Sequence, residues 1–219
     1  MTVAITIGEA LATWLAIDFL SGLFHWLEDA YGSPFSPVLG RHVTKPNILH
    51  HYMPRAFVTN SWYLSSRLLL LVCTLIALIT LAAGAFNWIV AFGLLLGVNA
   101  NQVHKWSHRT RHENSAPVRL LQRLRVIQTP GHHHRHHTLG KNTHYCVLTD
   151  FLNPILDRAH FWTGLESLIA RAFGVQRRDD AFTAAQVLTR EPEFFGAHVD
   201  LIRQRLAKAQ AAGYVAREA

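Results

Sequence analysis

Histidine dominates the chemistry available to this chain of 219 residues, which holds 15 histidines and only two cysteines. His104 and His108 are four residues apart, a spacing that places both imidazoles on one face of a helix. A second stretch, from His132 to His137, again spaces histidines three and four apart. Neutral imidazole binds iron, zinc and copper, and no cysteine-rich pair favours a structural zinc site. The spacing therefore predicts metal ligands, in preference to a solvated basic loop.

An apolar segment near the N-terminus carries a second polar pattern. Asp18, Gly22, His25 and Asp29 follow one another at offsets of four, three and four, so they form one helical stripe. A carboxylate inside a membrane segment is costly and is therefore a functional candidate. For Asp18 a structural hydrogen-bonding role is the competing interpretation, whereas His25 and Asp29 are expected to join the metal site.

The histidines are too numerous for one metal ion. His50 and His51 are adjacent and diverge on regular structure, so they are expected to serve two metals or one metal and an outer contact. The predicted ligands are His25, Asp29, His50, His51, His104, His108, His132, His133, His136 and His137. Nine imidazoles exceed the three protein ligands of a catalytic zinc. Two irons and dioxygen activation fit better, because iron has accessible oxidation states, and the Glu-x-x-His pairs of soluble di-iron bundles are missing.

The elements that must position these ligands are apolar. Half of the residues are hydrophobic and 16% are charged. Residues 5–27, 64–83 and 88–103 are each long enough, or nearly so, to cross a hydrocarbon layer of about 30 Å. A buried hairpin in a soluble protein is the alternative for the last two. The fold class predicted is an all-α integral membrane protein with about three transmembrane helices, interfacial helices and a cytoplasmic, histidine-rich di-metal site.

Charge placement predicts the topology. The formal charge is +7, but no Lys or Arg precedes Arg41 and none falls between Arg67 and Lys105. By the positive-inside rule the N-terminus is outside and the histidines are cytoplasmic, so the charge reflects orientation and no nucleic acid partner is expected. No cleavable signal is evident, and the two cysteines are expected to be reduced. The chain has 17 arginines and four lysines, a bias that indicates a bacterium with a GC-rich genome. The membrane expected is therefore a bacterial inner membrane.

The remaining segments are expected to support this site. Glycines and prolines between 32 and 46 predict an irregular loop. Residues 117–128 predict an interfacial amphipathic helix, and 151–173 predict a partly polar helix, interfacial or re-entrant. The domains predicted are a membrane domain, 1–175, and a polar helical tail, 176–219, with a helix over about 193–212.

Together these residues resemble the Kua family of lipid desaturases. The likeness rests on Asp18-x-x-Ser21-Gly22-x-x-His25-Trp26-x-x-Asp29-x-x-Gly32, His50-His51-x-x-Pro54, Asn101-Gln102-x-His104-Lys105-Trp106-Ser107-His108, His132-His133-x-x-His136-His137, Tyr145-Cys146, Asn153 and Phe161-Trp162-x-x-Leu165-Glu166. It implies a di-iron, dioxygen-dependent enzyme that acts on an intact phospholipid in the membrane and takes electrons from a separate carrier of the cytochrome b5 or ferredoxin type. Candidates for outer-sphere or substrate contacts are Asp18, Asn101, Gln102, His112, His144, Asn153 and Glu166.

The chain departs from the family pattern at a few positions. Lys141 stands where relatives often carry a further histidine, His144 stands where an aromatic residue is usual, and His112 and His134 are additions. His144 is therefore a candidate to replace the missing histidine.

The reaction expected is formation of a vinyl ether in an alkyl ether phospholipid, as in plasmalogen synthesis. Basic residues expected to seat the phosphate are Arg41, Lys45, Arg55, Arg119, Arg123 and Arg125. The nearest alternative is an acyl-chain desaturase or hydroxylase. A membrane zinc hydrolase lacks its general-base glutamate, and a non-enzymatic metal transporter would spread its ligands across the spans. The headgroup, the bond oxidised, the electron donor and the oligomeric state do not follow from the sequence.

Overall fold

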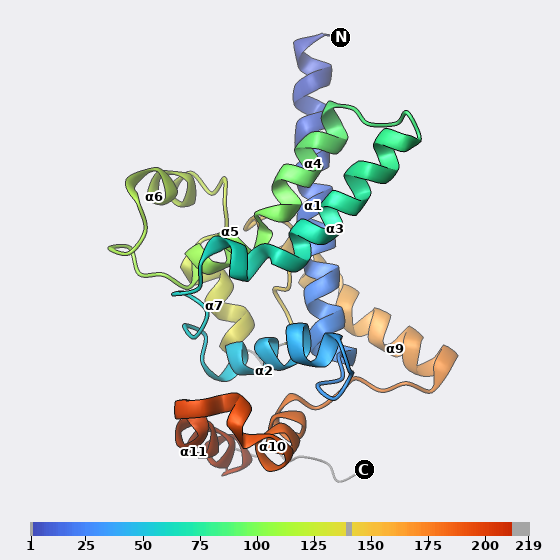
Figure 1. Ribbon diagram of the computed structural model, residues 1–219. Coiled ribbons are helices and arrows are strands. Elements are labelled where there is room, and N and C mark those ends of the chain that lie inside the picture. The colour runs from blue at the N-terminus through green and yellow to red at the C-terminus, as the bar shows by residue number, and fades with distance from the viewer. Residues whose placement is uncertain (1, 139–141, 212–219) are drawn as a thin grey trace. The chain divides into compact units, whose positions relative to one another are not determined.

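The computed structural model describes residues 2–138 and 142–211, and all regular secondary structure within these ranges is helical (Figure 1). This confirms the all-α prediction for the described chain. The chain divides into two compact units: the first holds residues 1–25 and 57–162, the second residues 26–56 and 163–219. The division falls inside two helices, α1 (Val3–Tyr31) and α9 (Phe161–Phe173).

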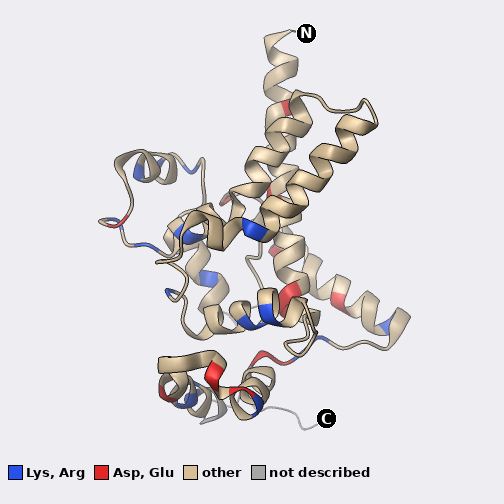
Figure 2. Ribbon diagram, in the orientation of Figure 1, with Lys and Arg blue, Asp and Glu red and all other residues tan. Residues whose placement is uncertain are grey.

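Two helices are long and apolar enough to cross a membrane. They are α1, with 29 residues, and α3 (Trp62–Ala82), with 21 residues. At about 1.5 Å per residue, even the shorter helix spans about 30 Å. Only 6% of the most apolar window of each is buried inside the protein, which argues against core helices of a soluble fold. In Figure 2 the upper turns of α3 and all of α4 (Trp88–Val98) carry no charge.

Helices α3 and α4 pack against each other as a helical hairpin. Gly84 enables the turn between them, because its φ of +65° lies in the left-handed region that favours glycine. The Asn87 side chain then caps α4 by accepting hydrogen bonds from the backbone N–H groups of Ile89 and Val90.

The predicted third apolar stretch, 88–103, is not one continuous helix. α4 ends at Val98, and α5 (Ala100–Ser107) begins after Asn99. The Asn99 side chain donates to the Leu95 carbonyl and accepts from Trp62 Nε1 at 3.0 Å. This asparagine competes with the helical backbone at that point. α5 packs against both α3 and α4 and carries the first histidine pair.

The first unit is completed by three short helices and an irregular segment. The helices are α6 (Ala116–Arg123), α7 (Pro130–Thr138) and α8 (Leu152–Arg158). Val103, Val118 and Leu148 belong to one buried apolar cluster that joins α5, α6 and the irregular segment 143–151. The predicted helix over 151–173 is two helices, because the backbone at His160 adopts a φ of +50° between α8 and α9.

The second unit has its own apolar core. The predicted irregular loop is wrong from residue 40 onward, where a π-helix (Gly40–Thr44) leads into α2 (Lys45–Tyr52), with Pro46 in its first turn. α10 (Asp180–Arg190), which the sequence did not reveal, packs against α2, and Ile48 meets Val187 in the core. The tail helix predicted over 193–212 is a 3₁₀ segment (Pro192–His198) followed by α11 (Val199–Ala211).

Candidate metal centre

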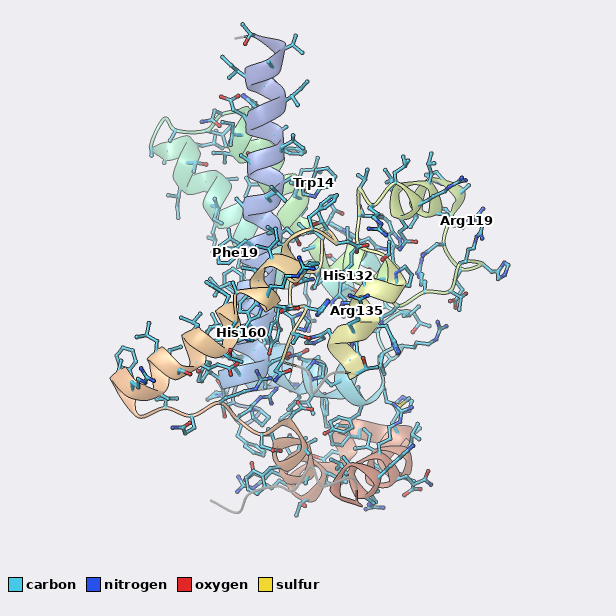
Figure 3. The ribbon with its side chains drawn as sticks, turned by 180° about the vertical axis from the view of Figure 1, so that it is seen from behind. Trp14, Phe19, Arg119, His132, Arg135 and His160 are labelled. Atoms are coloured by element: carbon cyan, nitrogen blue, oxygen red, sulfur yellow. The ribbon has the colours of Figure 1, made fainter. Side chains whose placement is uncertain are left out.

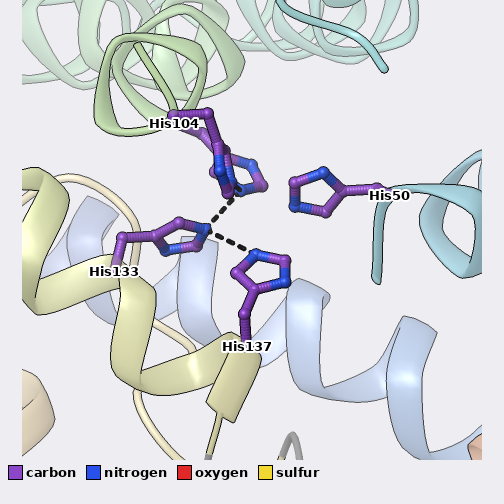
Figure 4. A group of neighbouring side chains, drawn as sticks. His50, His104, His133 and His137 are labelled. Carbon is purple, nitrogen blue, oxygen red and sulfur yellow. Dashed lines mark hydrogen bonds between the residues drawn. The ribbon is translucent and has the colours of Figure 1, made fainter. Parts of the chain in front are cut away.

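Four imidazoles of the first unit meet at their Nε2 atoms; we call them the tetrad. His104 and His108 come from α5 and its C-cap, and His133 and His137 come from α7. His104 Nε2 lies 2.8 Å from His133 Nε2 and 3.2 Å from His108 Nε2, and His137 Nε2 lies 3.2 Å from His133 Nε2. Figure 4 shows His104, His133 and His137 turned toward one another. All four ligand atoms lie within 4.8 Å of one another, as one metal site requires.

The surroundings of His133 favour its uncharged form. His133 is completely buried, and His104 is 9% exposed. Burial, and then the neighbouring imidazoles of His104, His108, His137 and His136, lower the pKa of His133 well below its ordinary value. At neutral pH its ring therefore offers a lone pair without first losing a proton.

A second histidine pair of the first unit is oriented by backbone carbonyls. The rings of His25 and His136 have centroids 4.5 Å apart. Nδ1 of His25 lies 3.1 Å from the Tyr145 carbonyl, and Nδ1 of His136 lies 2.8 Å from the Thr143 carbonyl. A carbonyl can only accept, so each Nδ1 carries the proton and each Nε2 keeps its lone pair. This arrangement is typical of metal-binding histidines.

The second unit holds its own histidine–carboxylate group. His51 Nε2 lies 3.3 Å from Asp29 Oδ1, and His51 Nδ1 lies 3.4 Å from Asp180 Oδ1. Asn47 Nδ2 donates to Asp29 Oδ1 at 2.5 Å. The adjacent rings of His50 and His51 are tilted by 45° with centroids 6.0 Å apart, as expected for neighbours on a helix.

His132, predicted as a ligand, lies outside the tetrad. Figure 3 shows His132 on α7, and its Nε2 lies 3.1 Å from Asn153 Nδ2. Asp150 Oδ1 lies 3.9 Å from its Nδ1, and the His144 ring lies 4.9 Å away. His144 Nδ1 contacts Asp157 Oδ2 at 2.7 Å. We call His132, His144, Asp150, Asn153 and Asp157 the carboxylate group.

The other residues predicted to make outer-sphere or substrate contacts differ in burial and in hydrogen-bond partners. Asn101 Nδ2 donates to the Ser65 carbonyl at 2.7 Å, which joins α5 to α3. Glu166 accepts from Trp26 Nε1 at 3.0 Å and from Arg177 Nη1 at 2.7 Å. Gln102 is half-buried, His112 and His134 are exposed, and Lys141 lies outside the described residues.

Asp18 fastens the irregular segment to α1. Its Oδ1 accepts from the Leu148 N–H at 2.9 Å and the Thr149 N–H at 3.3 Å, and its Oδ2 accepts from Thr149 Oγ1 at 2.5 Å. Gln128 also holds the irregular segment in place, because its side chain donates a hydrogen bond to the Cys146 carbonyl. The structural interpretation of Asp18 accounts for these contacts.

Sequence reasoning missed several residues around the site. The carbonyls of Thr143 and Tyr145 orient two imidazoles, but a backbone role has no signature in side-chain spacing. Asp180 contacts His51 from a distant segment, with no local pattern to show it. The centroid of the Phe57 ring lies 5.1 Å from that of His104 and 5.5 Å from that of His108. In the sequence, only the apolar character of Phe57 could have indicated a contact with these rings.

The donor set fits a redox-active metal. Imidazole nitrogens suit iron, copper and zinc, and carboxylate oxygens raise the affinity for harder ions. Four convergent Nε2 atoms already exceed the three protein ligands of a catalytic zinc. The residues of the first unit are thus able to hold iron.

Comparison with known proteins places the chain in a family. The lipid desaturase domain model matches residues 14–180, so the chain belongs to the lipid desaturase family. It is 33% identical to plasmanylethanolamine desaturase of Myxococcus xanthus over 80% of this chain and 64% of that protein. It is 34% identical to plasmanylethanolamine desaturase 1 of Mus musculus over 78% of this chain and 68% of that protein.

A third relative is named for a different substrate. A probable fatty acid desaturase of Acanthamoeba polyphaga mimivirus is 30% identical over 75% of this chain and 82% of that protein. The matched part of this chain spans about two thirds of the Myxococcus relative. No solved structure matches the chain. The family and the two apolar helices together indicate a membrane protein.

Proposed function

We propose that this chain is a di-iron lipid desaturase that uses dioxygen to introduce a vinyl ether double bond into an alkyl ether phospholipid. The observation that carries the proposal is the tetrad, because a buried core would not direct four Nε2 atoms at one another without a cation to share. The relatives named plasmanylethanolamine desaturase support the alkyl ether substrate.

In this proposal the iron ligands are those predicted from the sequence, with one change. The first unit supplies the tetrad together with His25 and His136. Asp29, His50 and His51 stay ligands predicted from the sequence. His132 is assigned an orienting role, because its ring faces Asn153 and Asp150.

Bound iron would supply the dioxygen-dependent oxidation of carbon–hydrogen bonds, with electrons from a separate carrier of the cytochrome b5 or ferredoxin type. The protein residues do the remaining work. The carbonyls of Thr143 and Tyr145 hold protons on Nδ1 of His136 and His25, so that Nε2 of each ring remains a ligand. The Phe57 ring shields His104 and His108 from water. The substrate carbon beside the ether oxygen is the favoured point of attack, because the oxygen lone pair stabilises electron deficiency there.

The membrane arrangement is part of the proposal. Three spans, the third over residues 88–103, would place the N-terminus outside and the histidines on the cytoplasmic side of a bacterial inner membrane. The domain boundary at residues 175 and 176 also remains a proposal. The segment after it shares a core with α2 in the second unit.

The second candidate is an acyl-chain desaturase that acts on phospholipid. The viral relative named as a probable fatty acid desaturase favours it, because the match covers more of that protein than of the Myxococcus relative. Metal chemistry and membrane placement would be the same for both candidates, so only the identity of the lipid product distinguishes them.

Lipid mass spectrometry of cells with and without the chain, before and after mild acid, separates these functions. Vinyl ethers that are lost on acid treatment and appear only with the intact protein are the expected result. A new acid-stable acyl double bond would instead establish the second candidate. No change in lipid unsaturation, from a protein that inserts and binds iron, would contradict both.

A further inference from the structure

A hollow in the first unit lies beside α6, and no tetrad residue is among those that line it. It has a volume of about 620 Å³ and is lined by Arg111, Arg119, Leu120, Gln122, Arg123, Thr129 and Pro130. Three of these seven residues are arginines. Figure 3 shows Arg119 projecting from α6, and Figure 2 shows basic residues along the same helix.

The arginines of this hollow are not neutralised by the protein. In residues 2–138 and 142–211, none of the three has a carboxylate within ion-pair distance. Arg119 Nη1 donates to the Asn114 carbonyl at 2.7 Å, which fixes its guanidinium and leaves its other N–H groups for a ligand. Planar guanidinium groups bind phosphate through paired hydrogen bonds. The hollow is therefore suited to a phosphate.

The same helix exposes apolar side chains. Leu120 and Leu124 are 55% and 61% exposed, whereas Val118 on the opposite side lies in the core. A short helix that presents leucine beside arginine is typical of a membrane interface, with leucine among acyl chains and arginine at the headgroups. This pattern favours a membrane lipid over a soluble anion as the source of the phosphate.

The hollow also adjoins the helix that carries the ligands. Thr129 and Pro130 line it, and Pro130 is the first residue of α7. His133 follows three residues later, about 4.5 Å along the helix axis at 1.5 Å per residue. In a glycerophospholipid only the glycerol backbone separates the phosphate from the first chain bond. A phosphate held here would keep the start of the chain near the tetrad.

We propose that Arg111, Arg119 and Arg123 bind the phosphate of the phospholipid substrate in this hollow. This inference rests on the proposed function, because only that function makes the bound phospholipid a substrate. The phosphate binding itself does not depend on it. The proposal changes the set of basic residues that the sequence predicted to bind the phosphate. Lys45 is ion-paired with Glu191, and Arg125 does not line the hollow, whereas Arg111 was not among the expected residues.

Binding to the purified full chain in detergent tests the inference. The ligands are a short-chain alkyl-acyl phosphatidylethanolamine, the matching alkyl-acyl glycerol without phosphate, and inorganic phosphate. In the double variant Arg119→Gln/Arg123→Gln, the dissociation constant for the phospholipid should rise about tenfold or more, as expected for lost charge-assisted bonds. Binding of the phosphate-free lipid should not change. Arg158→Gln, an exposed arginine of α8, is the matched control and should leave both unchanged.

Three results would overturn the proposal: phospholipid binding within twofold of wild type in the double variant, an equal loss for the lipid without phosphate, or inorganic phosphate binding as tightly as the phospholipid. The last would indicate a soluble anion. If the double variant does not fold, Arg111→Gln, at an exposed side chain, carries the same test. Arginine-dependent lipid binding without any desaturated product would contradict the proposed function and leave this inference standing.

Discussion

His132 and His133 are neighbours on α7, yet their rings belong to two different groups. His133 points its Nε2 at those of His104 and His137, at 2.8 and 3.2 Å. His132 points its Nε2 at the Asn153 amide and has Asp150 beside its Nδ1. The four Nε2 atoms of the tetrad thus converge on one point, while the His132 ring contacts an amide and a carboxylate of the protein.

The comparison teaches that the atoms facing an imidazole define its role. In the tetrad, imidazole faces imidazole, which leaves lone pairs for a cation. In the carboxylate group, oxygen atoms and an amide orient the rings and hold the segment 143–151 in place. One group is expected to control metal and turnover, and the other to control the stability of the framework.

The largest expected effect is on turnover in the tetrad. His104→Ala should reduce formation of the desaturated lipid by about 100-fold or more, because it removes one of the ligands proposed for iron. Membrane insertion should be retained. His134→Ala is the matched control, since His134 is exposed on α7, and it should keep most of the activity.

Lipid mass spectrometry on membranes with equal amounts of each variant measures this difference. Full activity of His104→Ala would contradict the assignment of the tetrad, whatever the behaviour of His134→Ala.

The next effect is on stability, at the anchor of the irregular segment. Asp18→Ala leaves the N–H groups of Leu148 and Thr149 and the Thr149 hydroxyl without their acceptor. Unsatisfied buried donors cost about 1–3 kcal/mol each, so the free energy of unfolding should fall by roughly 2–4 kcal/mol after partial relaxation. Thermal unfolding in detergent measures the change.

Asp18→Asn should lose less, because its carbonyl still accepts a backbone N–H. Asp200→Asn, at an exposed residue of α11, is the neutral control. An Asp18→Ala protein as stable as wild type would mean that the segment is held by other contacts.

The smallest effect expected is steric, on α1 itself. A Cβ on Gly22 would lie 2.6 Å from Cys146 Sγ and 3.0 Å from its backbone nitrogen, whereas a Cβ on Gly8 meets nothing within 4 Å. Gly22→Ala should therefore cost about 1–3 kcal/mol of stability through overpacking. Gly8→Ala should be neutral or stabilise the helix by about 0.5–1 kcal/mol.

Combining Gly22→Ala with Cys146→Ala sharpens this test, because the second change removes the sulfur that the new methyl meets. Partial recovery of the thermal midpoint is the expected outcome. Equal destabilisation by Gly22→Ala and Gly8→Ala would show that α1 and the segment do not pack as described.

Local sequence patterns predicted the parts of the fold that local physics decides. Apolar length identified α1 and α3, and the four-residue spacing placed His104 with His108 and His133 with His137. Each depends only on neighbours along one helix. The number of imidazoles led us to expect that these two histidine pairs converge, and the structure gives the distances between their Nε2 atoms.

Other features depend on contacts between distant segments, which spacing does not encode. The break at Asn99 needs the Trp62 indole, and α10 is stabilised by burying Val187 in the core with Ile48. His132 and His133 are equivalent by spacing, since each has a histidine four residues later. Only Asn153, brought close by the irregular segment, separates them.

The most direct test of the central claim is the iron content of the purified chain and of two neighbouring variants. The wild type should hold about two irons per chain, as expected for a di-iron ligand set. His133→Ala should lose most of its iron, and His132→Ala should retain it. Full iron in His133→Ala together with loss in His132→Ala would contradict the assignment of the tetrad as the metal centre.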